Sequence, residues 1–485
     1  MPTPSFFWYD YETFGTDTRR DRPVQFAGIR TTMELEPIAQ PVMFFCQPSR
    51  DSLPSPEACM VTGITPQQAE RKGVHEAGFA ALVHEQLAEP GTCAAGYNSL
   101  RFDDEVTRHL LYRNFYDPYA REWQHGNSRW DLLDLLRLCA ALRPDGINWP
   151  QHNDGTTIFK QEALVKANGI GQEHAHDALS DVQALVNLAR LIRTHKRRLW
   201  EWYFALRRKQ FVFDLINLKA MQPLLHVSGR YPARQYCLRI IAPLARHPMR
   251  PNEIIIYDLA SDPGPLLTLN EDEISDCLFT KLSDLPEGVK PIALRTIHVN
   301  RSPALAPLSV LDETSVERLQ LDLERSYAHR DLLLRGAADL IPKVQRVFAR
   351  ATPATSATDP ELALYEGFLP QCDKALLQKV RTSPPVDLAR SEQFPFQDPR
   401  HASLLLRYRA RNWPQTLSLT ERVQWDHFRR ERLTRRTPLT TLTLDDYFTH
   451  LAALRNDPSQ QLHLDLLDQL QAWGEQLDLE TRHIA

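Results

Sequence analysis

The sequence predicts three domains in a row: an α/β domain, a β-rich domain and an all-α domain. Strand-like and helical patterns alternate over residues 1–196, β-rich segments dominate 197–350, and only helical patterns remain over 353–485. A chain of 485 residues is also too long for one hydrophobic core. We therefore place the domain boundaries at these composition changes.

The first domain opens with hairpin-like strands and continues with alternating strands and helices. The predicted strands are FFWYD (6–10), FAGIRTT (26–32), PVMFFCQ (41–47) and GTCAAGYNS (91–99). The predicted helices are 74–88, 104–114, 131–143, 161–168 and 177–194. This order indicates a mixed sheet covered by helices.

The second and third domains differ in character. The predicted strands of the second are 236–244, 253–259 and 291–300, followed by helices within 313–335. The stretch ATPATSATDPE (351–361) has the composition of a linker. The helices predicted after it are 361–380, 401–411, 418–433 and 459–477.

Bulk composition excludes several classes of protein. The net charge of −4 gives no overall basic character, so a nucleic-acid site has to be a local patch. Seven cysteines without a C-x-x-C pair argue against a disulfide framework and a structural zinc site. No signal peptide or membrane span is evident, so we expect a cytoplasmic protein with no membrane partner.

The stretch SFFWYDYETFG (5–15) contains the first candidate site. Side chains alternate along a strand, so Asp10 and Glu12 point to the same face. Two like charges beside a core repel each other and lose hydration, and a divalent cation would compensate them. The alternative is that the strand has ended and both acids lie in solvent.

Two further motifs carry acids. In GYNSLRFDDEVTRHLL (96–111), Asp103 begins a helix after a strand, where an acid is also favourable for the helix dipole alone. In HAHDALSD (174–181), His176 precedes a long helix and Asp181 lies one turn into it, beside the apolar face. His176 could also be an idle loop residue, whereas a carboxylate at a packed face needs a partner.

These motifs together resemble the DEDDh group of 3′–5′ exonucleases, which have a ribonuclease-H-like fold. The flanking stretches resemble one family of that group, bacterial exonuclease I. They are VTGITPQQA (61–69), 96–134, ALRPDGINWP (141–150), KANGI (166–170), HVSG (226–229), LYEGF (364–368) and RYRARNWPQTL (407–417). The resemblance spans nearly the whole chain, and it implies an SH3-like middle domain and a helical C-terminal domain.

Such a site would hydrolyse phosphodiesters with two divalent ions roughly 4 Å apart. Oxygen ligands suit Mg²⁺, with Mn²⁺ as a substitute, and the absence of Cys from the motifs disfavours zinc. We assign Asp10 as the bridging ligand, Glu12 and Asp181 to one ion, and Asp103 to the second. His176 is the expected general base, since an imidazole with a pKa near 6.5 accepts a proton near neutral pH.

An unpaired 3′ end must reach this site, which calls for stacking aromatics and for cations that contact phosphates. Arg108, Tyr119, Trp123 and Arg137 lie close in sequence to the Asp103 helix, although core packing or ion pairs would also explain them. The resemblance implies that Glu12 contacts substrate and that Lys160 stands where relatives have a substrate-binding Arg. Lysine keeps that charge but loses the bidentate fork.

The stretch 401–436 is the expected local basic patch. It holds nine arginines against three acids, and Tyr408, Trp413, Trp425 and Phe428 are interleaved with them. A solvated helix face accounts for about half of these arginines. The remainder could hold the strand that leads into the nuclease site and so favour processive digestion.

The function predicted is a processive, Mg²⁺-dependent 3′–5′ exonuclease that converts single-stranded DNA to 5′-mononucleotides in DNA repair and recombination. An exoribonuclease of the same group is an alternative, because the five catalytic residues do not distinguish the sugars. A non-catalytic scaffold that binds single strands is another. The resemblance also implies binding to the C-terminal tail of single-stranded DNA-binding protein, and we expect a monomer.

Overall fold

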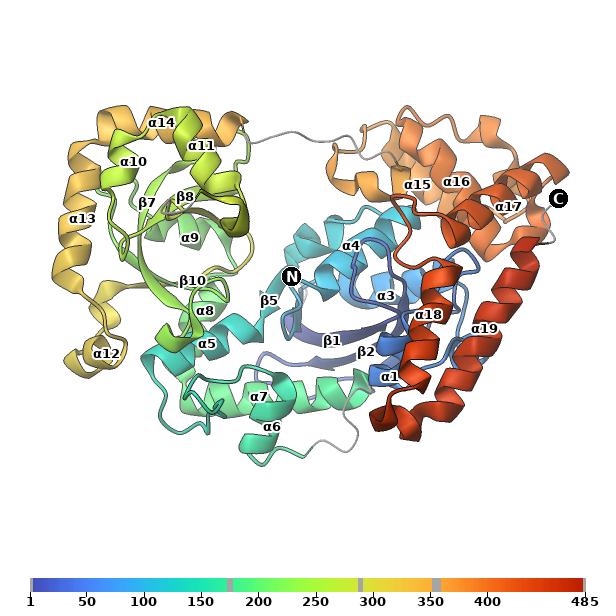
Figure 1. Cartoon of the computed structure of the whole chain (residues 1–485), viewed down its shortest axis with the longest axis horizontal. Coiled ribbons are helices and arrows are strands. Elements are labelled where there is room, and N and C mark those ends of the chain that lie inside the picture. The colour runs from blue at the N-terminus through green and yellow to red at the C-terminus, as the bar shows by residue number, and fades with distance from the viewer. Residues whose placement is uncertain (1–2, 172–177, 287–290, 351–358, 483–485) are drawn as a thin grey trace. The chain divides into compact units, whose positions relative to one another are not determined.

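The computed structural model describes residues 3–171, 178–286, 291–350 and 359–482 (Figure 1). The chain forms two compact units. Unit 1 comprises 1–128, 172–186 and 354–485, and unit 2 comprises 129–171 and 187–353. Among the described residues, no helix combines the length and the apolar character needed to cross a membrane.

The first sheet has five strands in the order β3-β2-β1-β4-β5. They are β1 (Ser5–Thr13), β2 (Pro23–Thr31), β3 (Val42–Phe45), β4 (Thr92–Gly96) and β5 (Ser128–Asp131). Strand β1 pairs antiparallel with β2 and parallel with β4, so the sheet is mixed, as predicted. The short β5 has no strand-like run of its own and was not predicted.

Alternation along β1 gives the sheet two different faces. Phe7, Tyr9 and Tyr11 pack in an apolar cluster with β2 and with helices α3 (Glu76–Ala88) and α4 (Asp103–Arg113). The alternate residues of the strand, which include Asp10 and Glu12, point to the other face. The strand continues to Thr13, so the two acids lie within it and not beyond its end.

The C-terminal helices belong to the same compact unit as β1. The helices of this part are α15 (Asp373–Thr382), α16 (Pro399–Asn412), α17 (Leu419–Thr434), α18 (Leu444–Arg455) and α19 (Leu464–Arg482). One apolar cluster joins α18 and α19 to α1 (Pro56–Thr62) and α2 (Pro66–Lys72), and Figure 1 shows α18 and α19 beside α1. A second joins Tyr112 and Phe115, at the end of α4, to α15 and α16.

Unit 2 contains the second sheet, with the order β10-β6-β7-β8-β9. Its strands are β6 (Leu224–Val227), β7 (Leu238–Arg246), β8 (Glu253–Asp258), β9 (Leu294–His298) and β10 (Ala304–Pro307), and each neighbouring pair is antiparallel. Three of the five strands match predicted strands. Both strands that were missed, β6 and β10, are only four residues long.

Helices complete both units. The remaining ones are α5 (Leu132–Leu142), α6 (Gln161–Ala167), α7 (Ala178–His195), α8 (Arg197–Ala205), α9 (Lys209–Leu215), α10 (Gly264–Thr268), α11 (Glu271–Phe279), α12 (Glu313–Arg318), α13 (Leu323–Arg335) and α14 (Ala337–Arg350). The helices predicted in the first domain correspond to α3–α7. Most of the predicted linker, residues 351–358, lies outside the described residues.

Candidate functional site

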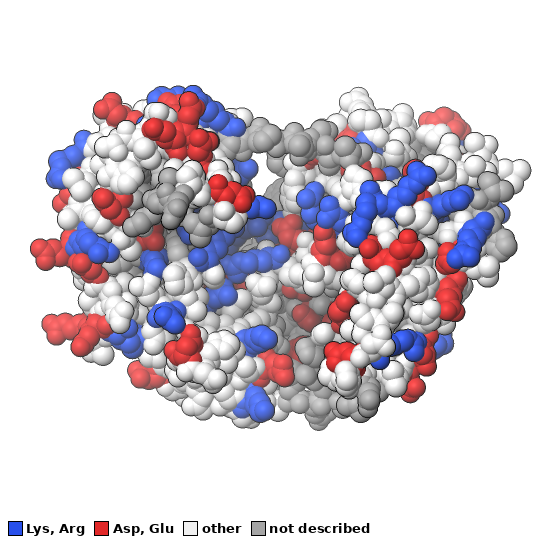
Figure 2. Space-filling view, viewed as in Figure 1, with Lys and Arg blue, Asp and Glu red and all other residues white. Residues whose placement is uncertain are grey.

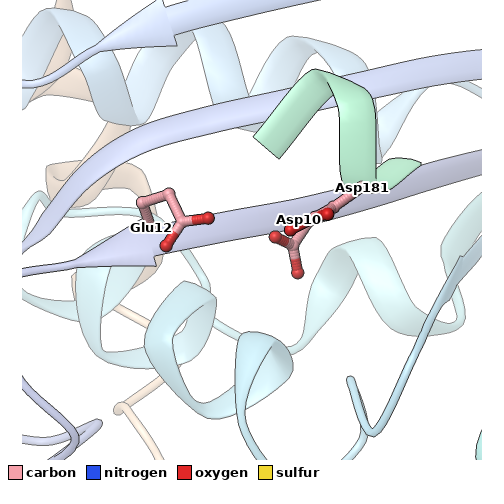
Figure 3. Close-up of side chains that lie close together, drawn as sticks. All are labelled: Asp10, Glu12 and Asp181. Atoms are coloured by element: carbon pink, nitrogen blue, oxygen red, sulfur yellow. The ribbon is translucent and has the colours of Figure 1, made fainter. Parts of the chain in front are cut away.

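Three carboxylates converge beside β1. One ligand oxygen from each of Asp10, Glu12 and Asp181 lies within 4.8 Å of the others, and Figure 3 shows the three side chains between β1 and the first turn of α7. Glu12 is buried, and Asp10 and Asp181 are half-buried. We call these three residues the carboxylate cluster.

Local structure brings the three residues together. Asp10 and Glu12 pair with Ala27 and Gln25 of β2, which fixes both on one face of the sheet. The amide side chain of Gln25 accepts a hydrogen bond from the backbone N–H of Ala178 at 3.4 Å, next to the start of α7. This contact holds the first turn of α7, and with it Asp181, beside β1.

Asp103 lies next to the carboxylate cluster but outside the group of three. It is the first residue of α4, it is 3 % exposed, and one of its carboxylate oxygens accepts the backbone N–H of Tyr11 at 3.2 Å. The hydroxyl of Thr107 donates to the backbone carbonyl of Asp103 at 2.7 Å. Asp103 is thus tied to β1 at the residue between Asp10 and Glu12.

The electrostatics of this region raise the pKa of two acids, Asp10 and Asp103. Burial, and then the neighbouring carboxylate of Asp181, raise the pKa of Asp10. Burial, and then Asp10, raise the pKa of Asp103 well above its ordinary value. A divalent cation binds the deprotonated forms and removes this repulsion, so the donor set fits a hard cation with oxygen ligands.

The predicted general base, His176, lies outside the described residues, as do 172–177 as a whole. Its assignment therefore stays a prediction. The described chain resumes at Ala178, three residues before Asp181.

The predicted strand-binding residues of unit 1 differ in their surroundings. Arg108 is 4 % exposed, and its guanidinium contacts Glu122 at 2.7 Å and Glu105 at 2.7 Å. This burial and double pairing would also account for Arg108 as a structural ion pair, and its contact with the strand stays a prediction. Tyr119 is half-buried beneath Arg108, whereas Trp123 is 66 % exposed and open to a stacking partner.

Lys160 and Arg137 both lie in unit 2. Lys160 is exposed at the residue before α6, and Arg137 pairs with Asp134 on α5 at 2.7 Å. The guanidinium of Arg137 lies 5.8 Å from the ring centroid of Phe159, the neighbour of Lys160. These two predicted residues therefore belong to one local surface.

The basic stretch 401–436 is less open than was predicted. At least seven of its nine arginines form ion pairs: 407, 409, 411, 429, 432, 435 and 436. Figure 2 shows acidic side chains next to the basic ones over the C-terminal helices, and Lys and Arg gathering on one side of unit 2. A count of arginines overstated the patch, because Arg407, Arg411, Arg429 and Arg432 have acidic partners outside the stretch.

Three of these arginines belong to a buried set that we call the arginine network. It comprises the acids Asp51, Glu76, Asp359 and Glu361 and the arginines Arg22, Arg113, Arg407, Arg411 and Arg432. Arg411 contacts Asp51 at 2.7 Å and Glu361 at 2.6 Å. Burial alone would raise the pKa of Asp51 and of Glu361, but the arginines, Arg411 foremost, hold both well below their usual range.

A cavity of about 540 Å³ opens beside Glu12. Its walls come from β1, α1, Phe102 and the C-terminal part of the chain. The lining residues are Tyr11, Glu12, Thr13, Gly15, Thr16, Asp21, Ser55, Glu57, Ala58, Val61, Thr62, Phe102, Thr441, Leu442 and His450. Sequence reasoning missed Thr441, Leu442 and His450, because nothing local links them to a site more than 400 residues away.

Sequence reasoning also missed the buried residues that contact Asp104, the neighbour of Asp103. The carboxylate of Asp104 accepts a hydrogen bond from the Tyr9 hydroxyl at 2.9 Å and one from Arg121 at 2.6 Å. The signal available was the repeated acid in FDDE, of which only the first was assigned a role.

Family models match the chain in three segments. The model described as "Exonuclease" matches residues 7–189, the "Exonuclease I SH3-like domain" matches 207–350, and the "Exonuclease I C-terminal domain" matches 358–477. Together they cover most of the chain. Their order along the sequence agrees with the predicted order of domains.

Individual relatives are similar over nearly the whole length. Exodeoxyribonuclease I of Escherichia coli is 44 % identical over 430 residues, which are 89 % of this chain and 90 % of the relative. A moderately thermophilic exonuclease I from Methylocaldum szegediense has a TM-score of 0.93 and 49 % identity, covering 98 % of this chain and 99 % of its own. The zinc-bound form of an E. coli exonuclease I–single-stranded DNA complex has a TM-score of 0.90 and 40 % identity, covering 98 % and 99 %.

Proposed function

The chain belongs to the exonuclease I family, and from this premise we propose that it is a processive 3′–5′ exonuclease that degrades single-stranded DNA to 5′-mononucleotides. The observation that carries the proposal is the carboxylate cluster, three acids within 4.8 Å of one another and with raised pKa at Asp10. Repair and recombination are the processes in which such an activity is expected.

Magnesium is the proposed cofactor, bound as two ions, with Mn²⁺ as a substitute. Asp10, Glu12 and Asp181 would hold one ion, and Asp103 together with Asp10 would hold the other. When bound, the ions stabilise negative charge on the attacking and leaving oxygens. Because a relative was solved with zinc, zinc belongs among the metals to be tested.

The chain's own residues supply the remaining steps. Glu12 lies on the wall of the cavity beside the carboxylate cluster, which supports its role in positioning the 3′-terminal nucleotide. His176 would take the proton of the attacking water. Trp123, Lys160 and Arg137 would contact the strand, with Tyr119 contributing through its half-buried ring.

The proposed domain division is 1–196, 197–350 and 353–485, and the three family models support it. The protein is proposed to act as a monomer in the cytoplasm. The C-terminal tail of single-stranded DNA-binding protein is the proposed protein partner, and mixing the two proteins in a binding titration would test this.

The proposal is tested with single-stranded DNA and RNA of the same sequence, labelled at the 3′ or the 5′ end, and with blunt duplex DNA. Each substrate is incubated in EDTA and with Mg²⁺, Mn²⁺ or Zn²⁺. We expect 3′-labelled mononucleotides from single-stranded DNA with Mg²⁺ or Mn²⁺, loss of activity in EDTA, and an intact duplex. Glu201→Gln changes an exposed acid of unit 2 and serves as the control variant.

Any of four results would contradict the proposal. Full activity in chelator would exclude a metal mechanism, and degradation from the 5′ end would exclude the assigned polarity. Preference for RNA over DNA would favour the exoribonuclease alternative. Strand binding without hydrolysis at any metal concentration would favour the scaffold alternative.

A further inference from the structure

A second acid follows Asp103 in the first turn of α4 and does not belong to the carboxylate cluster. Asp104 is 1 % exposed, and its carboxylate accepts hydrogen bonds from Tyr9 at 2.9 Å and from Arg121 at 2.6 Å. The three residues come from β1, from α4 and from the short 3-10 helix Ala120–Glu122. Asp104 therefore joins three separate segments at the point where Asp103 is placed.

This arrangement is costly as a purely structural device. The Arg121 side chain is fully buried, and within the described residues its Nε and Nη1 have no hydrogen-bond partner. A buried ion pair is often no more stabilising than apolar residues of the same volume, and buried donors without partners are destabilising. Stability alone is thus a poor explanation for the presence of this pair.

The position of the pair indicates another role. Tyr9 precedes Asp10 on β1, and Tyr11, which follows Asp10, donates its N–H to Asp103. Asp103 is therefore held directly by Tyr11 and, through its neighbour Asp104, by Tyr9. The acids that would hold cations and the Asp104–Arg121 pair share the same two segments of backbone.

Charge gives the pair a second consequence for the site. Asp104 and Arg121 carry opposite charges, so the pair adds no net charge to the acids that would bind cations. Without the charge of Asp104, Arg121 would keep only a longer contact of 3.9 Å to Glu122, and without Arg121 the charge of Asp104 would lose its nearest cation close to Asp103. In a buried region such a charge acts strongly on a neighbouring cation site.

We propose that Asp104 is a positioning residue of the cation site, which orients Asp103 through Tyr9 and whose charge is balanced by Arg121. The inference rests on the proposed function. It predicts that divalent cations bind more weakly to a variant that keeps the positive charge alone, and not more weakly to a variant that keeps the negative charge alone. Residues outside the ligand set that orient metal ligands typically change metal affinity by about 10–100-fold when they are mutated.

The experiment measures Mn²⁺ binding by electron paramagnetic resonance on the full chain without DNA. Asp104→Asn leaves Arg121 unbalanced and should weaken Mn²⁺ binding about 10–100-fold. Arg121→Met leaves Asp104 unbalanced and should not weaken it. The double variant is neutral again and should bind Mn²⁺ within a few-fold of wild type.

Further variants keep the test specific. Tyr9→Phe removes one hydrogen bond without changing charge, and its turnover should fall and be restored by excess Mg²⁺ while KM for the oligonucleotide stays constant. Asp258→Asn removes the acid of an Asp–Arg pair in unit 2 and should bind Mn²⁺ like wild type. If Asp104→Asn does not fold, the double variant and Tyr9→Phe still decide the question.

Failure of this inference can be told apart from failure of the proposed function. Asp10→Asn should lose high-affinity Mn²⁺ binding, and if it does not, the carboxylate cluster is not the metal site. If Asp10→Asn loses binding but Asp104→Asn matches wild type, Asp104 has no positioning role. A double variant that binds as weakly as Asp104→Asn also overturns the inference, because the charges then do not balance each other.

Discussion

Unit 1 buries two groups of acids in opposite ways. In the arginine network, Asp51 and Glu361 each contact more than one guanidinium, and their pKa values are lowered despite burial. In the carboxylate cluster, the influences on Asp10 are burial, Asp181 and one backbone N–H, and its pKa is raised. Arginine partners compensate the acids of the arginine network within the protein, whereas the raised pKa of Asp10 beside Asp181 marks acids that a cation from solution would compensate.

The two groups also connect different parts of the chain. The arginine network joins Arg22 and Asp51, near the first strands, to Glu361 and Arg411 of the C-terminal part. The carboxylate cluster joins β1 to α7 within the nuclease segment. One group therefore attaches the C-terminal helices to the nuclease strands, and the other brings acids of a strand and a helix together.

The largest effect that separates the two groups is expected on hydrolysis. Asp10→Asn should lower turnover by roughly 10³-fold or more, because the ions supply several kcal/mol of charge stabilisation and each 1.36 kcal/mol is tenfold in rate. Binding of single-stranded DNA, measured by fluorescence anisotropy in Ca²⁺, should change little. Loss of folding in this variant would show instead that Asp10 is structural.

The predicted base comes next in size. His176→Ala should lower turnover by roughly 10²–10⁴-fold, the usual contribution of a positioned proton acceptor. The wild-type rate should rise with pH as the imidazole loses its proton, and a pH–rate profile at saturating Mg²⁺ should show this limb flattened in the variant. If extra Mg²⁺ restores the variant, the histidine acts on the metal and not as the base.

Replacing an acid should lower the stability of the protein in the arginine network and raise it in the carboxylate cluster. Asp51→Asn leaves Arg411 and Arg432 without their shared carboxylate, and breaking such a buried pair costs about 3–5 kcal/mol. Asp10→Asn should raise the melting temperature in EDTA, because it removes one of several crowded acids. Calorimetry in EDTA measures the melting temperatures of both variants. If both variants are less stable than wild type, the two groups of acids do not differ in the way described.

The smallest expected effect is on the pH dependence of stability. Burial, and then Asp181, raise the pKa of Asp10 to about 8, so the folded state holds its proton more tightly than the unfolded state does. Its contribution is fully present at low pH and is lost as the pH rises from about 4 toward 8 in EDTA. Asp51 and Glu361 of the arginine network have lowered pKa values, so their contribution is present at neutral pH and is lost as the pH falls in acid.

Denaturant titrations across this pH range, with and without Mg²⁺, separate the two contributions. Saturating Mg²⁺ should flatten the upper part of the profile, since cation binding favours the deprotonated acids, and should leave the acid limb unchanged. If Mg²⁺ does not change the loss of stability toward pH 8, the acids that titrate there are not the cation ligands.

The sequence predicted which acids lie close together, because their signals are local. Strand alternation placed Asp10 and Glu12 on one face, and helix periodicity placed Asp181 at the edge of an apolar face. The partners of the arginines could not be predicted in this way. Arg411 and Asp51 are 360 residues apart, and no periodicity links them.

The same reason explains what was missed around the site. Asp104 is indistinguishable in sequence from any acid in a first helical turn, and only the packing of β1 against α4 shows that Tyr9 and Arg121 contact it. Short elements such as β5, β6 and β10 were missed because four residues carry too little alternation.

Anomalous diffraction from crystals grown with Mn²⁺ is the most direct test that the carboxylate cluster is a cation site. We expect two peaks roughly 4 Å apart, one bounded by Asp10, Glu12 and Asp181 and the other between Asp10 and Asp103. The arginine network should show no peak, because its carboxylates already have guanidinium partners. Ordered Asp10, Glu12 and Asp181 side chains with no manganese between them at saturating Mn²⁺ would contradict the assignment.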